Sequence, residues 1–120
     1  MAWAMGVPSA DVSSVATMLG KKLTINEFVA FSDLTQTMVP NAAGKLVKGY
    51  QTVLSNKSLI IVSFAICGFA NFSSVGMQIG GIGALVPERR ADLAKLGMRA
   101  LLCGTLASYL SATIAGMLIG

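Results

Sequence analysis

Charged side chains are scarce in this sequence, and histidine is absent from it. Only 12% of the 120 residues are charged, whereas a typical soluble domain carries about 25%. Hydrophobic residues make up 54% of the chain, and the mean hydropathy is +0.72. In water, a chain of this size and composition would leave large apolar patches exposed. The composition therefore predicts a membrane protein.

The missing residue types also exclude several kinds of chemistry. The sequence has no histidine, and Cys67 and Cys103 lack the CxxC spacing of metal sites. It shows no pair of nucleophile and base and no phosphate-binding loop, so we expect neither an enzyme nor a cofactor. We expect both cysteines to be small buried hydrophobic residues. The net charge of +4 does not predict nucleic-acid binding, because the basic residues flank apolar segments.

Two stretches of the chain, residues 58–87 and 100–120, contain no charged side chain. A helix that spans a bilayer needs about 20 mostly apolar residues, so both stretches are long enough. Basic residues gather between them at 89–99, which favours a cytoplasmic location for this turn. Residues 39–57 would then form an exposed loop on the outside.

Residues 9–38 are moderately apolar but too polar for a helix that faces lipid. Ser9 or Asp11 can cap a first short helix that ends at Gly20, and Asn26 can cap a second one. Neither helix is long enough to span, so we expect a re-entrant hairpin whose polar tip is a candidate site. An amphipathic hairpin on the membrane surface fits the same pattern.

Residues that disfavour helix gather near the middle of the first uncharged stretch: Gly68, Asn71, Ser73, Ser74 and Gly76. Glycine costs a helix about 1 kcal/mol against alanine, and Asn and Ser compete for backbone hydrogen bonds. We therefore expect a transmembrane helix over 58–86 that is interrupted there, as in transporters that bind substrate at mid-membrane. An intact helix that packs through its glycines is the alternative.

Residues 87–120 predict a continuous transmembrane helix. Pro87 suits the first turn, and acidic residues follow where the helix dipole is positive. Small residues then recur every four positions: Ala100, Gly104, Ser108, Ala112 and Gly116. Such a face lets another helix approach closely, so we assign it to packing rather than to chemistry.

Four residues are candidates for a binding site. Glu27 lies at the expected hairpin tip, where an ionisable group is costly and hence functional by default. An ionised carboxylate only accepts hydrogen bonds, which suits a ligand rich in hydroxyl groups such as a sugar. An ion pair between Glu27 and Lys21 or Lys22 is the competing interpretation.

Asn71 and Ser74 are three residues apart, so they can face one cavity and offer both donors and acceptors. Phe69 can add an apolar wall for a sugar or a base. Taken singly, the polar residues could instead bond to neighbouring helices, and Phe69 could pack against lipid.

Residues 20–31, GKKLTINEFVAF, resemble the signature of the concentrative nucleoside transporters, G-x-K-x-x-x-N-E-F-V-A followed by an aromatic residue or Met. Residues 67–74 (CGFANFSS), 78–83 (QIGGIG) and 87–90 (PERR) are similar to the C-terminal region of that family, in the same order. Together these segments cover nearly the whole chain.

The resemblance implies an all-α integral membrane protein of the plasma (inner) membrane, in contact with lipid. It implies a symporter of nucleosides driven by sodium or protons. Its re-entrant hairpin and the following interrupted helix would hold the ribose, with Glu27, Asn71 and Ser74 as ligands and Phe69 beside them. Lys22 matches the lysine of the signature, for which we expect a structural role.

Two parts of the family pattern have no match in this sequence. One is a second hairpin, which binds the nucleobase and helps to form the cation site; the other is the scaffold that forms the trimer. We therefore expect one transport-domain segment that needs an N-terminal part or companion chain. The alternative is a small helical membrane protein without transport activity, which binds partner helices through the face containing Gly104 and Gly116.

Overall fold

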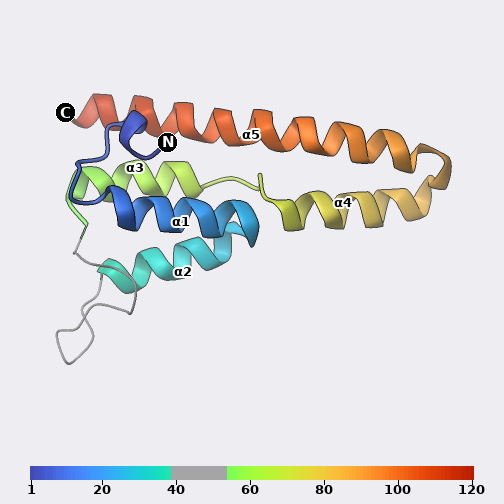
Figure 1. The fold of residues 1–120 in the computed structure, drawn as a ribbon, viewed down its shortest axis with the longest axis horizontal. Coiled ribbons are helices and arrows are strands. Elements are labelled where there is room, and N and C mark those ends of the chain that lie inside the picture. The colour runs from blue at the N-terminus through green and yellow to red at the C-terminus, as the bar shows by residue number, and fades with distance from the viewer. Residues whose placement is uncertain (39–53) are drawn as a thin grey trace.

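The computed structural model describes residues 1–38 and 54–120, and within these ranges all regular structure is helical (Figure 1). The elements, in chain order, are η1 (Trp3–Met5), α1 (Val12–Thr24), α2 (Glu27–Met38), α3 (Asn56–Ile66), α4 (Phe72–Leu85), η2 (Pro87–Arg89) and α5 (Arg90–Ile119), where η marks a 3-10 helix. The prediction of an all-α chain is confirmed.

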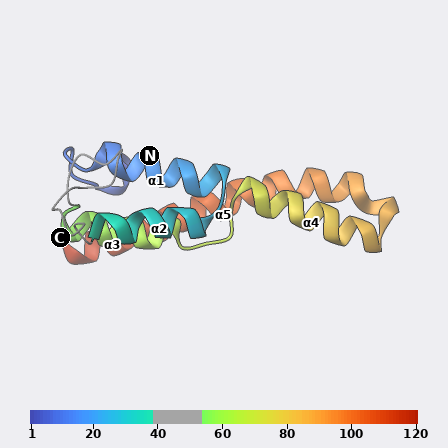
Figure 2. The same cartoon turned by 90° about the horizontal axis from the view of Figure 1, so that it is seen from below.

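Helix α5 runs along the whole length of an elongated molecule that measures 54 × 32 × 17 Å. Helices α3 and α4 lie end to end along α5, and the hairpin of α1 and α2 packs beside α3 (Figures 1 and 2). The tip of the hairpin therefore lies next to the gap between α3 and α4.

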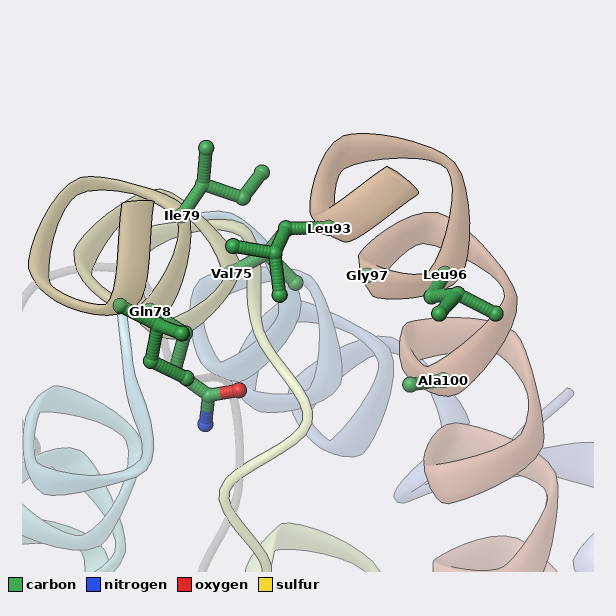
Figure 3. Close-up of a pocket in the computed structure, with 8 residues that line it drawn as sticks. Val75, Gln78, Ile79, Leu93, Leu96, Gly97 and Ala100 are labelled. Atoms are coloured by element: carbon green, nitrogen blue, oxygen red, sulfur yellow. The ribbon is translucent and has the colours of Figure 1, made fainter. Parts of the chain in front are cut away.

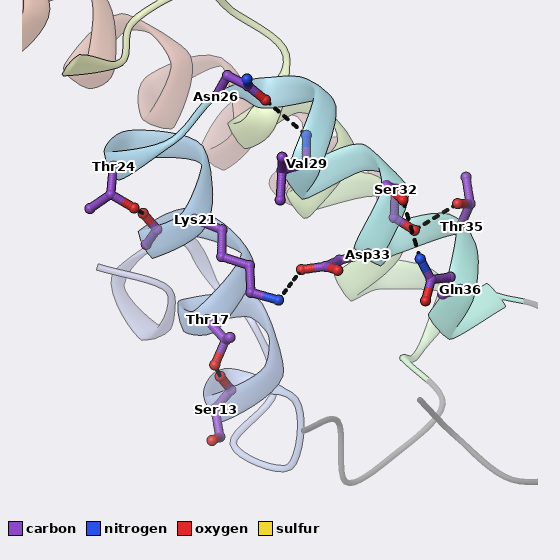
Figure 4. A network of polar contacts seen from close by, with 11 residues as sticks. Ser13, Thr17, Lys21, Thr24, Asn26, Val29, Ser32, Asp33, Thr35 and Gln36 are labelled. Carbon is purple, nitrogen blue, oxygen red and sulfur yellow. Dashed lines mark hydrogen bonds and ion pairs between the residues drawn. The ribbon is translucent and has the colours of Figure 1, made fainter. Parts of the chain in front are cut away.

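The hairpin tip is shorter than predicted. Helix α1 continues through Gly20 to Thr24, so the prediction that Gly20 ends it is wrong. Good helix formers follow Gly20, and the hydroxyl of Thr24 donates a hydrogen bond to the carbonyl oxygen of Gly20 at 2.8 Å. Asn26 caps α2 as expected, because its Oδ1 accepts a hydrogen bond from the backbone N–H of Val29 at 3.0 Å (Figure 4).

Asp11 stands at the N-cap position of α1, but its side chain makes no capping bond there. Its Oδ2 instead accepts hydrogen bonds from the hydroxyls of Ser55 (2.7 Å) and Ser58 (2.6 Å) and from the backbone N–H of Ser55 (3.1 Å). The buried carboxylate thus joins the base of the hairpin to the start of α3.

The predicted exposed loop at 39–57 lies mostly outside the described residues, and its end differs from the prediction. Leu54 is buried, and α3 already begins at Asn56. The hydroxyl of Ser55 accepts from the backbone N–H of Ser58, which starts the helix two residues earlier than we expected.

The helix predicted over 58–86 is interrupted in the structure, which excludes the intact alternative. Helix α3 ends at Ile66 and α4 begins at Phe72, whereas residues 67–71 form no helix. Of the residues that were expected to interrupt the helix, Ser73, Ser74 and Gly76 lie inside α4. The gap therefore contains only the first two, Gly68 and Asn71. Gly68 has a φ of 147°, which side chains rarely adopt, and a Cβ there would lie 2.9 Å from the Ser108 hydroxyl oxygen.

One described helical stretch, Pro87–Ile119, is long and apolar enough to cross a membrane, and α3 and α4 are shorter apolar helices. The small residues of α5 pack within the chain. A Cβ on Gly116 would lie 2.8 Å from Ile61, and one on Gly104 would lie 3.1 Å from the Cβ of Ala70. This face therefore holds α5 against α3 and against the gap that follows α3.

The prediction that both cysteines are buried is wrong, because Cys67 and Cys103 are exposed. Cys67 follows the last residue of α3, where the backbone leaves the helix. Cys103 follows the exposed Leu102 within α5.

Candidate functional site

The hairpin tip and the gap between α3 and α4 meet in one hydrogen bond. The Nδ2 of Asn71 donates to the Oε2 of Glu27 at 2.8 Å, across 44 positions of sequence. Glu27 is the first residue of α2, and Asn71 is the N-cap of α4. The N-termini of two helices, whose dipole ends carry partial positive charge, therefore meet at the carboxylate.

Asn71 is fully buried, and both ends of its amide are engaged. Its Oδ1 accepts a hydrogen bond from the backbone N–H of Ser74 at 2.7 Å, which caps α4, while its Nδ2 binds Glu27. An amide that accepts at one end and donates at the other has a single favourable orientation. The cap of α4 therefore aims the donor of Asn71 at the carboxylate.

Ser74 is buried, and its hydroxyl oxygen has no hydrogen-bond partner within the described parts of the chain. Buried polar groups are nearly always paired, so an unpaired hydroxyl calls for an explanation. Ser74 lines a pocket of about 220 Å³ together with Phe69 and Gln78. The side chain of Phe69 is 59% exposed and is free to contact a ligand there.

A neighbouring pocket of about 140 Å³ lies between α4 and α5 (Figure 3). Its lining is apolar except for Gln78, which follows Ser74 by one helical turn and lines both pockets. Gln78 was not among the predicted site residues, although its spacing of four residues from Ser74 could have indicated it.

The alternative interpretation of Glu27, an ion pair with Lys21 or Lys22, is not found in the structure. Lys21 pairs with Asp33 of α2 instead (Figure 4). Lys22 is fully buried and interacts electrostatically with Glu27, but it makes no ion pair with it. Hydrogen bonds thus join Glu27, Asn71 and Ser74 where α2, the gap and α4 meet. Phe69 shares a pocket with Ser74, which Glu27 and Asn71 do not line. No cluster of three or more metal-ligating side chains is found among the described residues.

A family model described as "Na+ dependent nucleoside transporter C-terminus" matches residues 1–116. The chain belongs to this family. The resemblance noted in the sequence is thereby confirmed. Membership also establishes an integral membrane protein, which agrees with the long apolar helix Pro87–Ile119.

Relatives in this nucleoside transporter family match nearly the whole chain. The putative nucleoside permease NupX of Escherichia coli (strain K12) is 42% identical over 120 residues, which cover 100% of this chain and 26% of the relative. The sodium/nucleoside cotransporter 2 of Rattus norvegicus is also 42% identical, over 98% of this chain and 18% of its own length.

Solved structures of CNTnw show the same fold. In its inward-facing, substrate-bound state, CNTnw has a TM-score of 0.81 and 40% sequence identity, over 96% of this chain and 26% of that protein. The chain thus spans about a quarter or less of the length of these three relatives.

Proposed function

We propose that this chain is the C-terminal part of a cation-coupled nucleoside symporter, and that its own contribution is to bind the ribose. The observation that carries this proposal is the hydrogen bond between Asn71 and Glu27. This bond places a carboxylate, a buried amide and an unpaired serine hydroxyl around one point, between the tip of a hairpin and the gap in a helix.

The chemistry of these groups matches the two neighbouring hydroxyls of a ribose. Within the described chain, Oε2 is the one oxygen of Glu27 that accepts a hydrogen bond, so the other can accept from a hydroxyl. The Ser74 hydroxyl can both donate to and accept from the second one. Phe69 lies on the same pocket as Ser74 and offers an apolar surface to the ring.

Coupling to sodium or protons, and recognition of the base, belong in this proposal to the rest of the transporter. One relative is named a sodium/nucleoside cotransporter, which supports sodium as the ion. Transporters built from two repeats bind substrate between the repeats, so this segment supplies one wall of the site. We place the complete protein in the plasma (inner) membrane as a trimer.

The structure gives no support to the alternative of a small interaction protein. That function needs the small-residue face of α5 for a partner helix, yet Ile61 of α3 already packs on Gly116 and Ala70 on Gly104. Since this face is occupied within the chain, we favour transport.

Uridine uptake by the complete transporter, reconstituted in vesicles, tests the proposal. Glu27→Gln should weaken uptake at low uridine concentration by roughly 10- to 100-fold, because a hydrogen bond to a charged group contributes about 1.5–3 kcal/mol. Ser74→Ala should act in the same direction, since it removes the unpaired hydroxyl. Ser73→Ala, an exposed neighbour on α4, is the matched control and should change little. Undiminished uptake by Glu27→Gln would refute the ribose assignment.

A further inference from the structure

Lys22 is the largest fully buried side chain among the described residues. Its Nζ makes no hydrogen bond within the described chain. A buried ammonium group is costly unless opposite charge or dipoles surround it. The neighbouring Lys21 avoids this cost, because its side chain is partly exposed and forms an ion pair with Asp33. Some other feature must therefore explain why Lys22 lies inside.

Two sources of negative charge lie close to the Lys22 ammonium. One is the Glu27 carboxylate, whose charge acts on Lys22 across the turn that joins α1 and α2. The other is the C-terminal end of α3, because its C-cap residue, Cys67, lies near Lys22. The last carbonyls of a helix lack partners within the helix and carry partial negative charge, which favours a cation there.

The helices around Lys22 agree with this placement, because α1 packs against both α2 and α3. Lys22 thus lies near both the residue that would accept from the ribose and the helix end that precedes the gap. It is fully buried, whereas Glu27 is partly exposed. The ammonium can therefore act on Glu27 through its charge without contacting the nucleoside.

We propose that Lys22 is a positioning residue of the ribose site, whose charge holds the Glu27 carboxylate and the end of α3 in the arrangement that binds substrate. The inference rests on the proposed function, because it assumes that Glu27 contacts the nucleoside. It assigns to Lys22 a role that depends on its charge and is exerted through Glu27, rather than one of filling space.

Equilibrium binding of uridine to the complete transporter in detergent tests this role. Lys22→Gln keeps a long polar side chain but removes the charge, and it should weaken uridine binding by about tenfold, within the range of coupling between interacting residues. Lys22→Arg restores the charge and should recover most of the affinity. Lys21→Gln is the matched control on the adjacent position and should bind uridine nearly as the wild type does.

A double-mutant cycle separates this role from a merely structural one. If Lys22 acts through Glu27, then Lys22→Gln should have little further effect on affinity in a Glu27→Gln background. Equal effects of Lys22→Gln in both backgrounds, or no recovery by Lys22→Arg, would overturn the inference. Should Lys22→Gln fail to fold, the double variant should regain folded protein, since the Glu27 charge that Lys22 balanced is then also removed. Failure of the double variant to fold would likewise overturn the inference.

The same cycle distinguishes failure of this inference from failure of the proposed function. If Glu27→Gln alone binds uridine as tightly as the wild type, the ribose assignment falls and the inference falls with it. If Glu27→Gln binds weakly but the two substitutions are additive, the ribose assignment stands and only the role of Lys22 is lost.

Discussion

At the scale of single residues, Asn71 has two roles, one in capping a helix and one in holding Glu27. Its amide oxygen caps α4, and its amide nitrogen donates to Glu27. A substitution that retains one task and removes the other can show which of them substrate binding requires.

Asn71→Asp separates the two tasks. Aspartate caps helices as well as asparagine does, so α4 should remain folded. A carboxylate cannot donate to Glu27 and repels it, so uridine affinity should fall by about tenfold or more. A binding isotherm and circular dichroism of the complete transporter measure the two effects. Asn56→Asp, at the exposed start of α3, is the control; wild-type affinity in Asn71→Asp would show that the bond to Glu27 is not needed.

Asp11 should matter for stability more than its expected role as a helix cap would suggest. Asp11→Ala removes a buried acceptor of three hydrogen bonds and should destabilise the protein by roughly 1.5–3 kcal/mol. Asp92→Ala is the matched control, because the exposed pair of Asp92 and Arg89 should contribute less than about 1 kcal/mol. Thermal unfolding in detergent compares the two, and equal losses would argue against a specific role of Asp11.

Residue type and spacing predicted part of this site. Glu27 is an acidic residue in an apolar setting, and Asn71 and Ser74 are polar residues three apart, so each could be identified from sequence. The hydrogen-bond partners of Asp11 could not be predicted from sequence, because a carboxylate at the start of a helix can cap its own helix or bind to a distant one. Only the folded chain brings Ser58, 47 positions away, within 2.6 Å of it.

At the scale of helices, the contact of α5 with α3 depends on residues without bulk. Gly116→Ala would place a Cβ 2.8 Å from Ile61, and overpacking of this kind costs about 1–3 kcal/mol. The thermal midpoint should fall accordingly. Gly80→Ala in α4 meets no atom within 4 Å and should be neutral or stabilising, since alanine favours helix. Equal midpoints for the two variants would contradict this packing.

The local sequence pattern predicted which segments are helical better than it predicted where each helix begins and ends. Glycine and serine disfavour helix only weakly, so Gly20 and Gly76 lie within helices that tertiary packing and neighbouring residues sustain. The positive φ of Gly68 marks where the chain leaves the helix, but it has no signature in sequence beyond the glycine itself.

At the scale of the whole molecule, α4 and α5 present much of their apolar surface outward. Large exposed side chains include Phe72 and Met77 on α4 and Leu102, Leu106 and Leu110 on α5. Such a surface suits lipid or further transporter helices. It agrees with membership of a membrane family in which this chain spans about a quarter or less of the two relatives described above.

The excess of basic residues at 89–99 predicts that the turn between α4 and α5 is cytoplasmic and that the base of the hairpin faces outward. The turn between α4 and α5 and the base of the hairpin lie at opposite ends of the long axis of the molecule (Figure 1). In a complete transporter without other reactive cysteines, Glu88→Cys should react with an impermeant thiol reagent only from the cytoplasmic side, and Ser9→Cys only from outside. The reverse pattern of labelling would invert the topology.

The central claim is that Glu27 and its neighbours bind ribose hydroxyls, and a substrate lacking those hydroxyls tests it most directly. The affinities of the complete transporter for uridine and for 2′,3′-dideoxyuridine should be compared in the wild type and in Glu27→Gln. We predict that the wild type prefers uridine by at least about tenfold, as expected for lost hydrogen bonds to a charged group, and that Glu27→Gln loses most of this preference. An unchanged preference in Glu27→Gln would contradict the account.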